Sequence, residues 1–205
     1  MKAYKTNLIL IFLLLGISPW AFSASAEMSS KHFRLVKDLM NNNLAYSQDA
    51  TTTNIIEWEE EIVDSLRQKK DYRNMFLMKQ MAVYAYSLQA KISEALKKAD
   101  AMMDEARLMK YNIGISLSYQ ALGDIYLNAG MRPEAVEEYE KAMKTLQATP
   151  HAEKIQERIF IQLVPTLIKL KRMDEAKAYL EHMSEICESK CLSPFLLYAY
   201  HAYYY

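Results

Sequence analysis

The sequence predicts an all-α protein built as a solenoid of helix pairs. Glycine and proline are scarce, at 4 and 5 of 205 residues, and β-branched residues do not alternate with polar ones over any long stretch. A pattern of large and small residues also recurs at a nearly constant interval, with copies centred on Ala95, Ala135 and Ala176. A fixed period of this length is typical of stacked helical hairpins, because each hairpin buries its apolar face only against its neighbours.

The clearest copy of the pattern runs from Ser116 to about Pro150. In chain order, its characteristic residues are Tyr119, Leu122, Gly123, Tyr126, Ala135, Tyr139 and Ala142. Because Gly123 has no side chain, a second helix can approach the first closely there, and Ala135 is expected opposite it for the same reason. Tyr126 and Tyr139 are expected to fill the space between adjacent hairpins.

These residues resemble the signature of the tetratricopeptide repeat family. The resemblance covers roughly Phe76 to the end, with one strong copy and two weaker ones: the earlier copy has no glycine, and the later has Val164 at the small position. It implies a right-handed superhelical solenoid of antiparallel helix pairs, with about three full repeats, an atypical N-terminal hairpin and an incomplete C-terminal one. Pro165 falls inside a first helix, where it removes a backbone hydrogen bond and is expected to kink the helix.

The three repeats predict six helices in three hairpins. Their expected ranges are 75–89 with 93–110, 115–128 with 133–146, and 152–170 with 173–186. Pro133 suits the first turn of its helix, where a missing N–H costs little. Gly130 belongs to the turn between the central helices, and Lys91 and Lys171 are expected at the comparable place in the neighbouring turns.

Two further helices are expected before the repeats. Ser29 or Ser30 can cap a helix that ends near Leu39. Residues 51–54 supply a second cap signal, ahead of a helix with four apolar residues on one face: Ile55, Trp58, Ile62 and Leu66. The expected organisation is therefore a leader at 1–26, an atypical hairpin at 27–72, the repeats at 73–192 and a partial repeat at 193–205.

The first 26 residues have the features of a cleavable secretory signal. Lys2 and Lys5 precede an unbroken apolar segment at residues 8–17, and Ala24-Ser25-Ala26 is a small-x-small cleavage site. The apolar segment is short for a membrane span, which needs about 20 residues, and no later stretch is long enough. We therefore expect cleavage after Ala26 and export to a bacterial periplasm, with a retained signal anchor as the alternative.

The charge balance and the absence of catalytic motifs narrow the range of possible functions. Without Lys2 and Lys5 the 25 basic residues become 23, against 25 acidic ones, which gives no electrostatic case for nucleic acid as a partner. The sequence contains no glycine-rich phosphate loop, no G-x-S-x-G and no H-E-x-x-H, and its histidines are scattered. We expect no enzymatic activity, no cofactor and no bound metal.

Cys187 and Cys191 are the only cysteines. An oxidising compartment favours a local disulfide between them, although side chains four residues apart on a regular helix run parallel and would strain it. Free or redox-active thiols are the alternative. A metal site with His182, five residues upstream, lacks a fourth ligand.

The last residues predict a helix without a polar face. Ser193-Pro194 opens this helix, and its tyrosines include Tyr198, Tyr200, Tyr203 and Tyr204. The first helix of a hairpin needs the second to bury its apolar side. We expect either that the sequence is a truncated form of a longer protein or that this helix docks on a partner or a second copy.

The resemblance also implies a binding surface. In the tetratricopeptide repeat family, the first helices line a concave groove that holds an extended peptide or a partner's helix. By position, the groove residues here are Gln80, Tyr84, Ser87, Leu117, Gln120, Asp124, Leu127, Asn128, Arg158, Ile161 and Lys169. The family clamps a peptide carboxylate with repeated Lys, Arg and Asn. Only Asn128, Arg158 and Lys169 qualify here, which argues against such a clamp.

Three functions remain open at this point. The first is a non-catalytic scaffold that binds a protein or peptide. A signal peptide followed by weak repeats also resembles the exported sensor regions of envelope histidine kinases and helix-turn-helix regulators. The second is a self-contained periplasmic assembly factor that oligomerises through the tyrosine-rich end. The third, an enzyme or glycan binder using the clustered tyrosines, ranks last because stacked aromatic residues in a repeat are normally its core.

Overall fold

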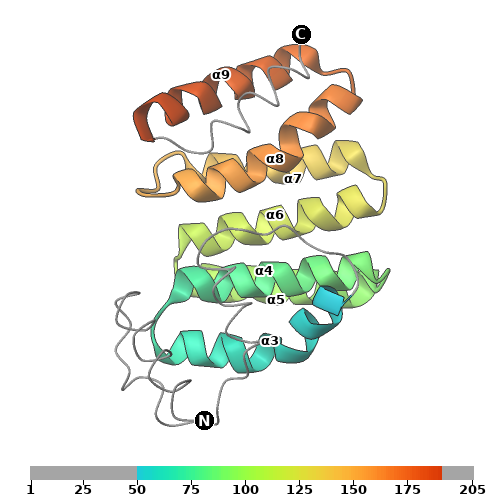
Figure 1. Ribbon diagram of the computed structural model, residues 1–205, viewed down its shortest axis with the longest axis vertical. Coiled ribbons are helices and arrows are strands. Elements are labelled where there is room, and N and C mark those ends of the chain that lie inside the picture. The colour runs from blue at the N-terminus through green and yellow to red at the C-terminus, as the bar shows by residue number, and fades with distance from the viewer. Residues whose placement is uncertain (1–49, 191–205) are drawn as a thin grey trace, which may run out of the picture.

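The computed structural model describes residues 50–190, and this part of the chain contains helices and no strands. In order the helices are α3 (Ala50–Gln68), α4 (Tyr72–Leu88), α5 (Ile92–Leu108), α6 (Asn112–Asn128), α7 (Arg132–Leu146), α8 (Glu153–Lys169) and α9 (Met173–Lys190). They stack along one axis, from α3 at one end to α9 at the other (Figure 1). The predicted all-α solenoid is confirmed. Within residues 50–190, none of the helices combines the length and the apolarity needed to cross a membrane.

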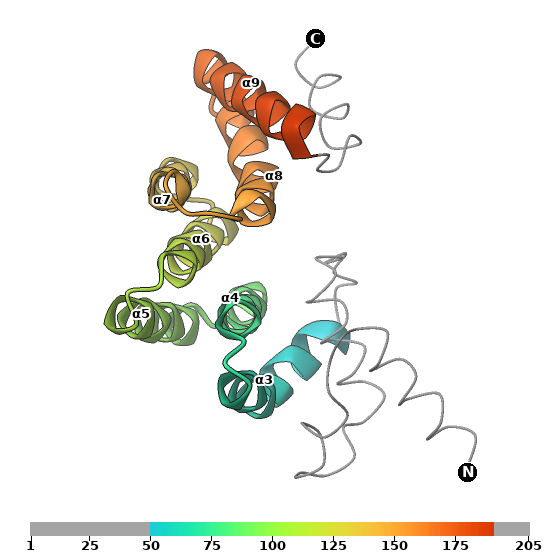
Figure 2. The ribbon, with the colours of Figure 1, turned by 90° about the vertical axis from the view of Figure 1, so that its left-hand side faces the viewer.

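The helices after α3 form the three predicted pairs, α4–α5, α6–α7 and α8–α9. Each expected range agrees with the observed helix to within four residues at both ends. Figure 2, a view along the helices, shows α5 and α7 on one side of the stack and α4 and α8 on the other, with α6 set back between the latter two. We call the face formed by α4, α6 and α8 the inner face.

Five turns between helices are built alike, with one residue in the left-handed region at the same place. These residues are Lys70, Ala90, Lys110, Gly130 and Lys171, with φ from 51° to 80°. In the central turn, the Gly130 N–H donates to the Leu127 carbonyl (3.0 Å) and the Met131 N–H donates to the Tyr126 carbonyl (2.9 Å). This pair of bonds closes the last turn of a helix and sends the chain back along it. The first four of these residues recur at a constant interval, one helix apart, so each repeat consists of two similar halves.

The comparison of turns corrects one prediction. Lys171 occupies the left-handed position, as expected from Gly130. In the first repeat, however, that position belongs to Ala90, and Lys91 is the N-cap residue of α5. Only the central turn places a glycine where the backbone conformation favours one.

Helix starts differ from the prediction for local reasons. α3 begins at Ala50, so residues 51–54 lie inside the helix and do not cap it. α4 begins earlier than expected because the Asp71 carboxylate accepts hydrogen bonds from the backbone N–H of Asn74 (3.3 Å) and from its side-chain amide (2.7 Å). The helix predicted between Ser29 or Ser30 and Leu39 lies outside the described residues. α8 continues through Pro165 but bends along its length (Figure 1).

The core confirms the size pattern of the repeats. The small residues Ala95, Ala99, Ala135, Ala142 and Ala176 are fully buried. Tyr139, Phe76 and Phe160 are the bulkiest of the fully buried side chains among the described residues. On α3, the apolar face packs inward as predicted, since Ile55, Ile62 and Leu66 are buried and Trp58 is half-buried.

Candidate binding surface

The predicted groove residues divide into a buried and an accessible group. Five are buried: Gln80, Ser87, Leu117, Gln120 and Asp124. Tyr84, Leu127 and Arg158 are half-buried, and Asn128, Ile161 and Lys169 are exposed. The expectation that all eleven line an open groove is therefore corrected, because a ligand cannot reach the first five as the helices are packed.

Asp124 on α6 is the centre of a buried polar cluster. Its Oδ1 accepts a hydrogen bond from the Tyr139 hydroxyl on α7, and its Oδ2 accepts one from Gln80 Nε2 on α4, each at 2.7 Å. Arg158 Nη2 on α8 donates to Gln80 Oε1 at 3.0 Å, although the two residues are 78 positions apart. The cluster therefore connects helices from all three repeats.

The glycine of the central repeat makes room for this cluster. A Cβ on Gly123 would lie 2.5 Å from Cε1 of Tyr139. The ring therefore passes directly over the α6 backbone, and its hydroxyl reaches the carboxylate of the next residue, Asp124. The close approach predicted at Gly123 is confirmed, and the atoms nearest to it belong to Tyr139.

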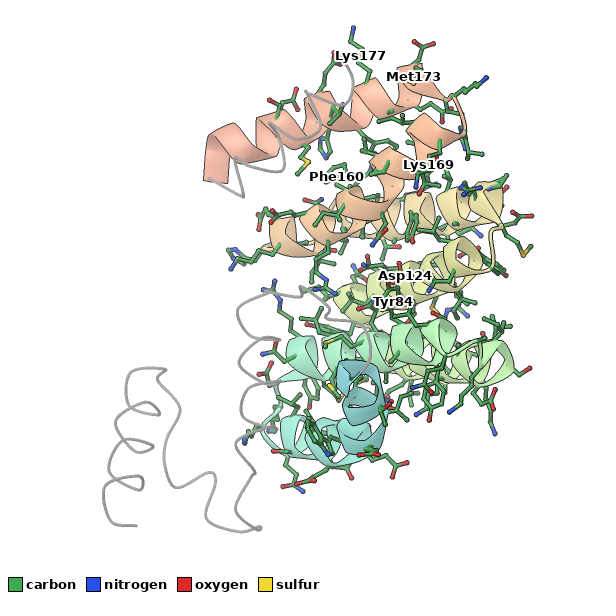
Figure 3. All side chains as sticks on the ribbon, turned by 45° about the vertical axis from the view of Figure 1, so that its right-hand side comes forward. Tyr84, Asp124, Phe160, Lys169, Met173 and Lys177 are labelled. Carbon is green, nitrogen blue, oxygen red and sulfur yellow. The ribbon has the colours of Figure 1, made fainter. Side chains whose placement is uncertain are left out.

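Burial changes the acid–base properties of the cluster. It raises the pKa of Asp124 to about 6, although the hydrogen bonds from Tyr139 and Gln80 and the charge of Arg158 act in the opposite direction. Burial and the charge of Asp124 both raise the pKa of Tyr84, which Figure 3 shows beside Asp124 on the neighbouring helix. The same two causes raise the pKa of Tyr139. Asp124 therefore gains or loses its charge near neutral pH while the tyrosines stay protonated.

A second polar contact joins α4 and α6 closer to their C-terminal ends. Asn128 Nδ2 donates a hydrogen bond to Ser87 Oγ at 2.7 Å, and Ser87 Oγ donates to the Tyr84 carbonyl at 2.8 Å. Gln120 on α6 is also buried, and its Oε1 accepts no hydrogen bond from the described residues. Ser87 and Gln120 thus belong to helix packing and not to an open surface.

Apart from Ile161 in the middle of α8, the exposed residues of the predicted groove lie where α6 and α8 end, next to the turns that follow. By repeat position, Asn128 at the end of α6 is equivalent to Leu88 at the end of α4 and to Lys169 at the end of α8. We call this surface the turn edge; its residues are Leu88, Leu127, Asn128, Met131, Ile168, Lys169 and Met173. The three turns share one edge of the stack in Figure 1, and Lys169 and Met173 lie near one another in Figure 3.

The exposed side chains of the turn edge differ in polarity from those on α5 and α7. Leu88, Met131 and Met173 are 39%, 42% and 37% exposed, so three large apolar side chains are accessible on this edge. Exposed residues on α5 and α7 are mostly charged and include Glu94, Lys97, Asp100, Asp104, Glu137, Lys141 and Lys144. Leu108 is 85% exposed but stands at the opposite edge, because α5 runs antiparallel to α4. Ile161, in the middle of α8, is 37% exposed. Three of the five exposed large apolar side chains in the described residues therefore belong to the turn edge.

Two sets of predicted residues fall outside the described side chains. They are the possible disulfide at Cys187 and Cys191 and the possible interface at Tyr198, Tyr200, Tyr203 and Tyr204, and both stay predictions. His182, the third member of the metal alternative, packs its ring against Phe160 with centroids 6.0 Å apart.

The sequence pattern indicated neither the buried cluster nor the apolar residues of the turn edge. A signal for the cluster was present at Tyr139, because a tyrosine at a core position needs an acceptor for its hydroxyl. The Tyr139 ring faces Gly123, and the polar residue next to Gly123 in the sequence is Asp124. Leu88, Met131 and Met173 had no comparable signal, since an apolar residue at a helix end is as often buried as exposed.

Comparison with known families supports the architecture. Residues 117–145 and 158–189 match the family model described as tetratricopeptide repeat. The first match covers most of α6 and α7, and the second covers most of α8 and α9. No curated protein matches the sequence. The two matched segments, together with the stacked helix pairs, are similar to tetratricopeptide repeats.

Proposed function

We propose that this protein is a non-catalytic scaffold that binds a protein or peptide partner along the turn edge. Tetratricopeptide repeats indicate a protein-interaction scaffold. On this chain, the Asp124 cluster fills the middle of the inner face. The partner therefore contacts the C-terminal ends of α4, α6 and α8 and the turns beyond them.

The observation that carries this proposal is that three of the five exposed large apolar side chains in the described residues, Leu88, Met131 and Met173, lie in or beside turns on one edge of the stack. Covering such side chains with a partner is favourable, at roughly 25 cal/mol per Å² of apolar surface. Methionine side chains adapt to partners of different shape. Asn128 and Lys169, at the ends of α6 and α8, are exposed on the same edge and offer an amide and a positive charge. A segment with apolar side chains and oxygen acceptors fits this surface best.

A random peptide library displayed on phage tests the binding surface. Peptides selected on the purified protein are measured again on two variants, Met131→Asp and Leu108→Asp. Both place a carboxylate on an exposed apolar position, and aspartate is a favoured residue at the N-cap position that Met131 holds, so α7 is not weakened. We expect Met131→Asp to weaken binding about tenfold or more, a loss of about 1.4 kcal/mol, and Leu108→Asp to leave it unchanged. Equal peptide binding by both variants refutes the turn edge as the binding surface.

The proposal places the scaffold outside the cytoplasm. Lys2 and Lys5, the apolar segment at 8–17 and the small residues at 24–26 support export through a cleaved signal. N-terminal sequencing of the protein from an envelope fraction tests this step. A first residue of Glu27 is expected, and an intact leader on protein recovered from the cytoplasm contradicts it.

The finer role that we infer is the sensing portion of a signal-transduction or regulatory protein. It is supported by an export signal that leads into weakly conforming repeats. Immunoblotting of whole cells with an antibody against the repeats measures the size of the natural gene product. A product that carries a membrane span and an output domain after the repeats supports the sensor. A product no longer than the 205-residue chain excludes it.

A further inference from the structure

A hydrogen bond joins the two flanks of the inner face beside Asp124. Gln80 on α4 bonds to Asp124 and to Arg158 at the same time, so α4 and α8 are joined across α6. Figure 2 shows α6 set back between these two helices. Asp124 itself is 3% exposed. Movement of α8 away from α4 would break the hydrogen bond between Arg158 and Gln80, the residue that donates to Asp124. It would also open a path by which water could reach the carboxylate.

The connection that precedes α8 is suited to such a movement. Residues 147–152 join α7 to α8, whereas each of the other connections between the described helices has three residues. This connection contains Pro150 and a left-handed residue, His151. The pair α8–α9 is thus attached to the preceding helices by the longest connection in the described part of the chain.

The groups that face Asp124 leave it as the one that titrates near neutral pH. Tyr84 and the neutral amide of Gln80 face it from α4, Tyr139 faces it from α7, and Arg158 faces it from α8. Both tyrosines have raised pKa values and keep their protons. Arginine stays charged at any ordinary pH. Protonation of this cluster therefore means protonation of Asp124.

We propose that Asp124, Gln80 and Arg158 form a proton-linked latch, in which proton uptake by Asp124 stabilises the closed inner face and ionisation favours movement of α8 away from α4. A buried carboxylate is costly, and hydration relieves that cost. The charge of Arg158 opposes opening, but the effect of burial on Asp124 is the larger of the two.

The direction of the pH dependence follows from linkage. The pKa of Asp124 is about 6 in the closed arrangement and near 3.8 when the carboxyl is exposed, so the closed form binds the proton more tightly. Closure is therefore most favoured below about pH 4, and the advantage is lost as the pH rises through about 6. The latch does not depend on what the turn edge binds.

Double electron–electron resonance between two spin labels tests the latch. Labels on Leu88→Cys and Lys169→Cys, with Cys187→Ser and Cys191→Ser to remove the native thiols, report the separation of α4 from α8. A second pair, Leu88→Cys with Met131→Cys, does not involve α8 and serves as the control. From about pH 5 to about pH 7.5, the first pair should shift toward longer distances and the control pair should not move. In Asp124→Asn, which carries no charge at either pH, the first pair should give the same distances at both.

Two results would overturn the latch: an unchanged distribution for the first pair in the native background, or the same shift in Asp124→Asn. If Asp124→Asn does not fold, the titration of Asp124 in the native protein decides the question. Its side-chain carboxyl carbon, followed by NMR, should titrate near pH 6. A midpoint near 4 rejects the proposal.

Discussion

The Tyr139 ring occupies the space that a side chain at residue 123 would need. A Cβ on Gly123 would lie 2.5 Å from Cε1 and 2.7 Å from Cδ1 of the ring, well inside van der Waals contact. The same ring carries the hydroxyl that bonds to Asp124 at 2.7 Å. Residue 123 therefore controls both the packing of α7 on α6 and the position of the buried cluster.

Gly123→Ala should destabilise the protein. Alanine favours a helix more than glycine does, by roughly 0.5–1 kcal/mol, but the added methyl group must displace a buried aromatic ring at a cost of about 1–3 kcal/mol. Urea unfolding should therefore show a lower midpoint. The control is the same substitution in a Tyr139→Leu background, where the ring is gone. An equal loss in both backgrounds would show that the ring is not the cause.

Two substitutions at equivalent turn positions should have opposite effects. Gly130 has φ 80° with nothing within 4 Å of a built Cβ, so Gly130→Ala adds only backbone strain, about 1 kcal/mol. Ala90 already bears that strain, with φ 58°, and Ala90→Gly should raise the melting temperature. Ala129→Gly is the control, because Ala129 is right-handed and glycine there should destabilise. If Ala90→Gly also destabilises, the turns are not equivalent.

Glu105 should hold α3 against the rest of the stack. It accepts a hydrogen bond from Arg67 on α3 (3.1 Å) and pairs with Lys79 on α4. Burial raises the pKa of Glu105, but its bonds and ion pairs with Lys79 and Arg67 outweigh burial and leave the pKa below its ordinary value. The stabilisation is therefore present above about pH 4.5 and is lost as the pH falls through the folded value.

Glu105→Gln should accordingly increase hydrogen exchange in α3 at neutral pH. The pairs are partly exposed, so we expect a loss of about 1 kcal/mol or less, smaller still in high salt. Asp104→Asn makes the same change of charge at the exposed neighbouring position and should leave α3 unaffected. Equal hydrogen exchange of α3 in both variants would show that Glu105 does not stabilise α3.

Residue size predicted the helix pairs well, because close packing between repeats tolerates only small side chains at positions such as Ala95, Ala135 and Ala176. Repeat register also placed Gln80 and Asp124 on the correct face. It could not show that they are bonded to one another and to Arg158, because these contacts join residues 44 and 78 positions apart. The left-handed backbone at Ala90 could not be predicted either, because the position is occupied by alanine and not by glycine.

Site-specific photocrosslinking in cells tests the central claim, binding at the turn edge, most directly. Benzoylphenylalanine is placed at Met131 in one strain and at Leu108, on the opposite edge, in another, and the adducts are compared on immunoblots. The account predicts protein adducts from position 131 that are absent or much weaker from position 108. Equal adducts from both positions, or adducts from position 108 alone, would contradict it.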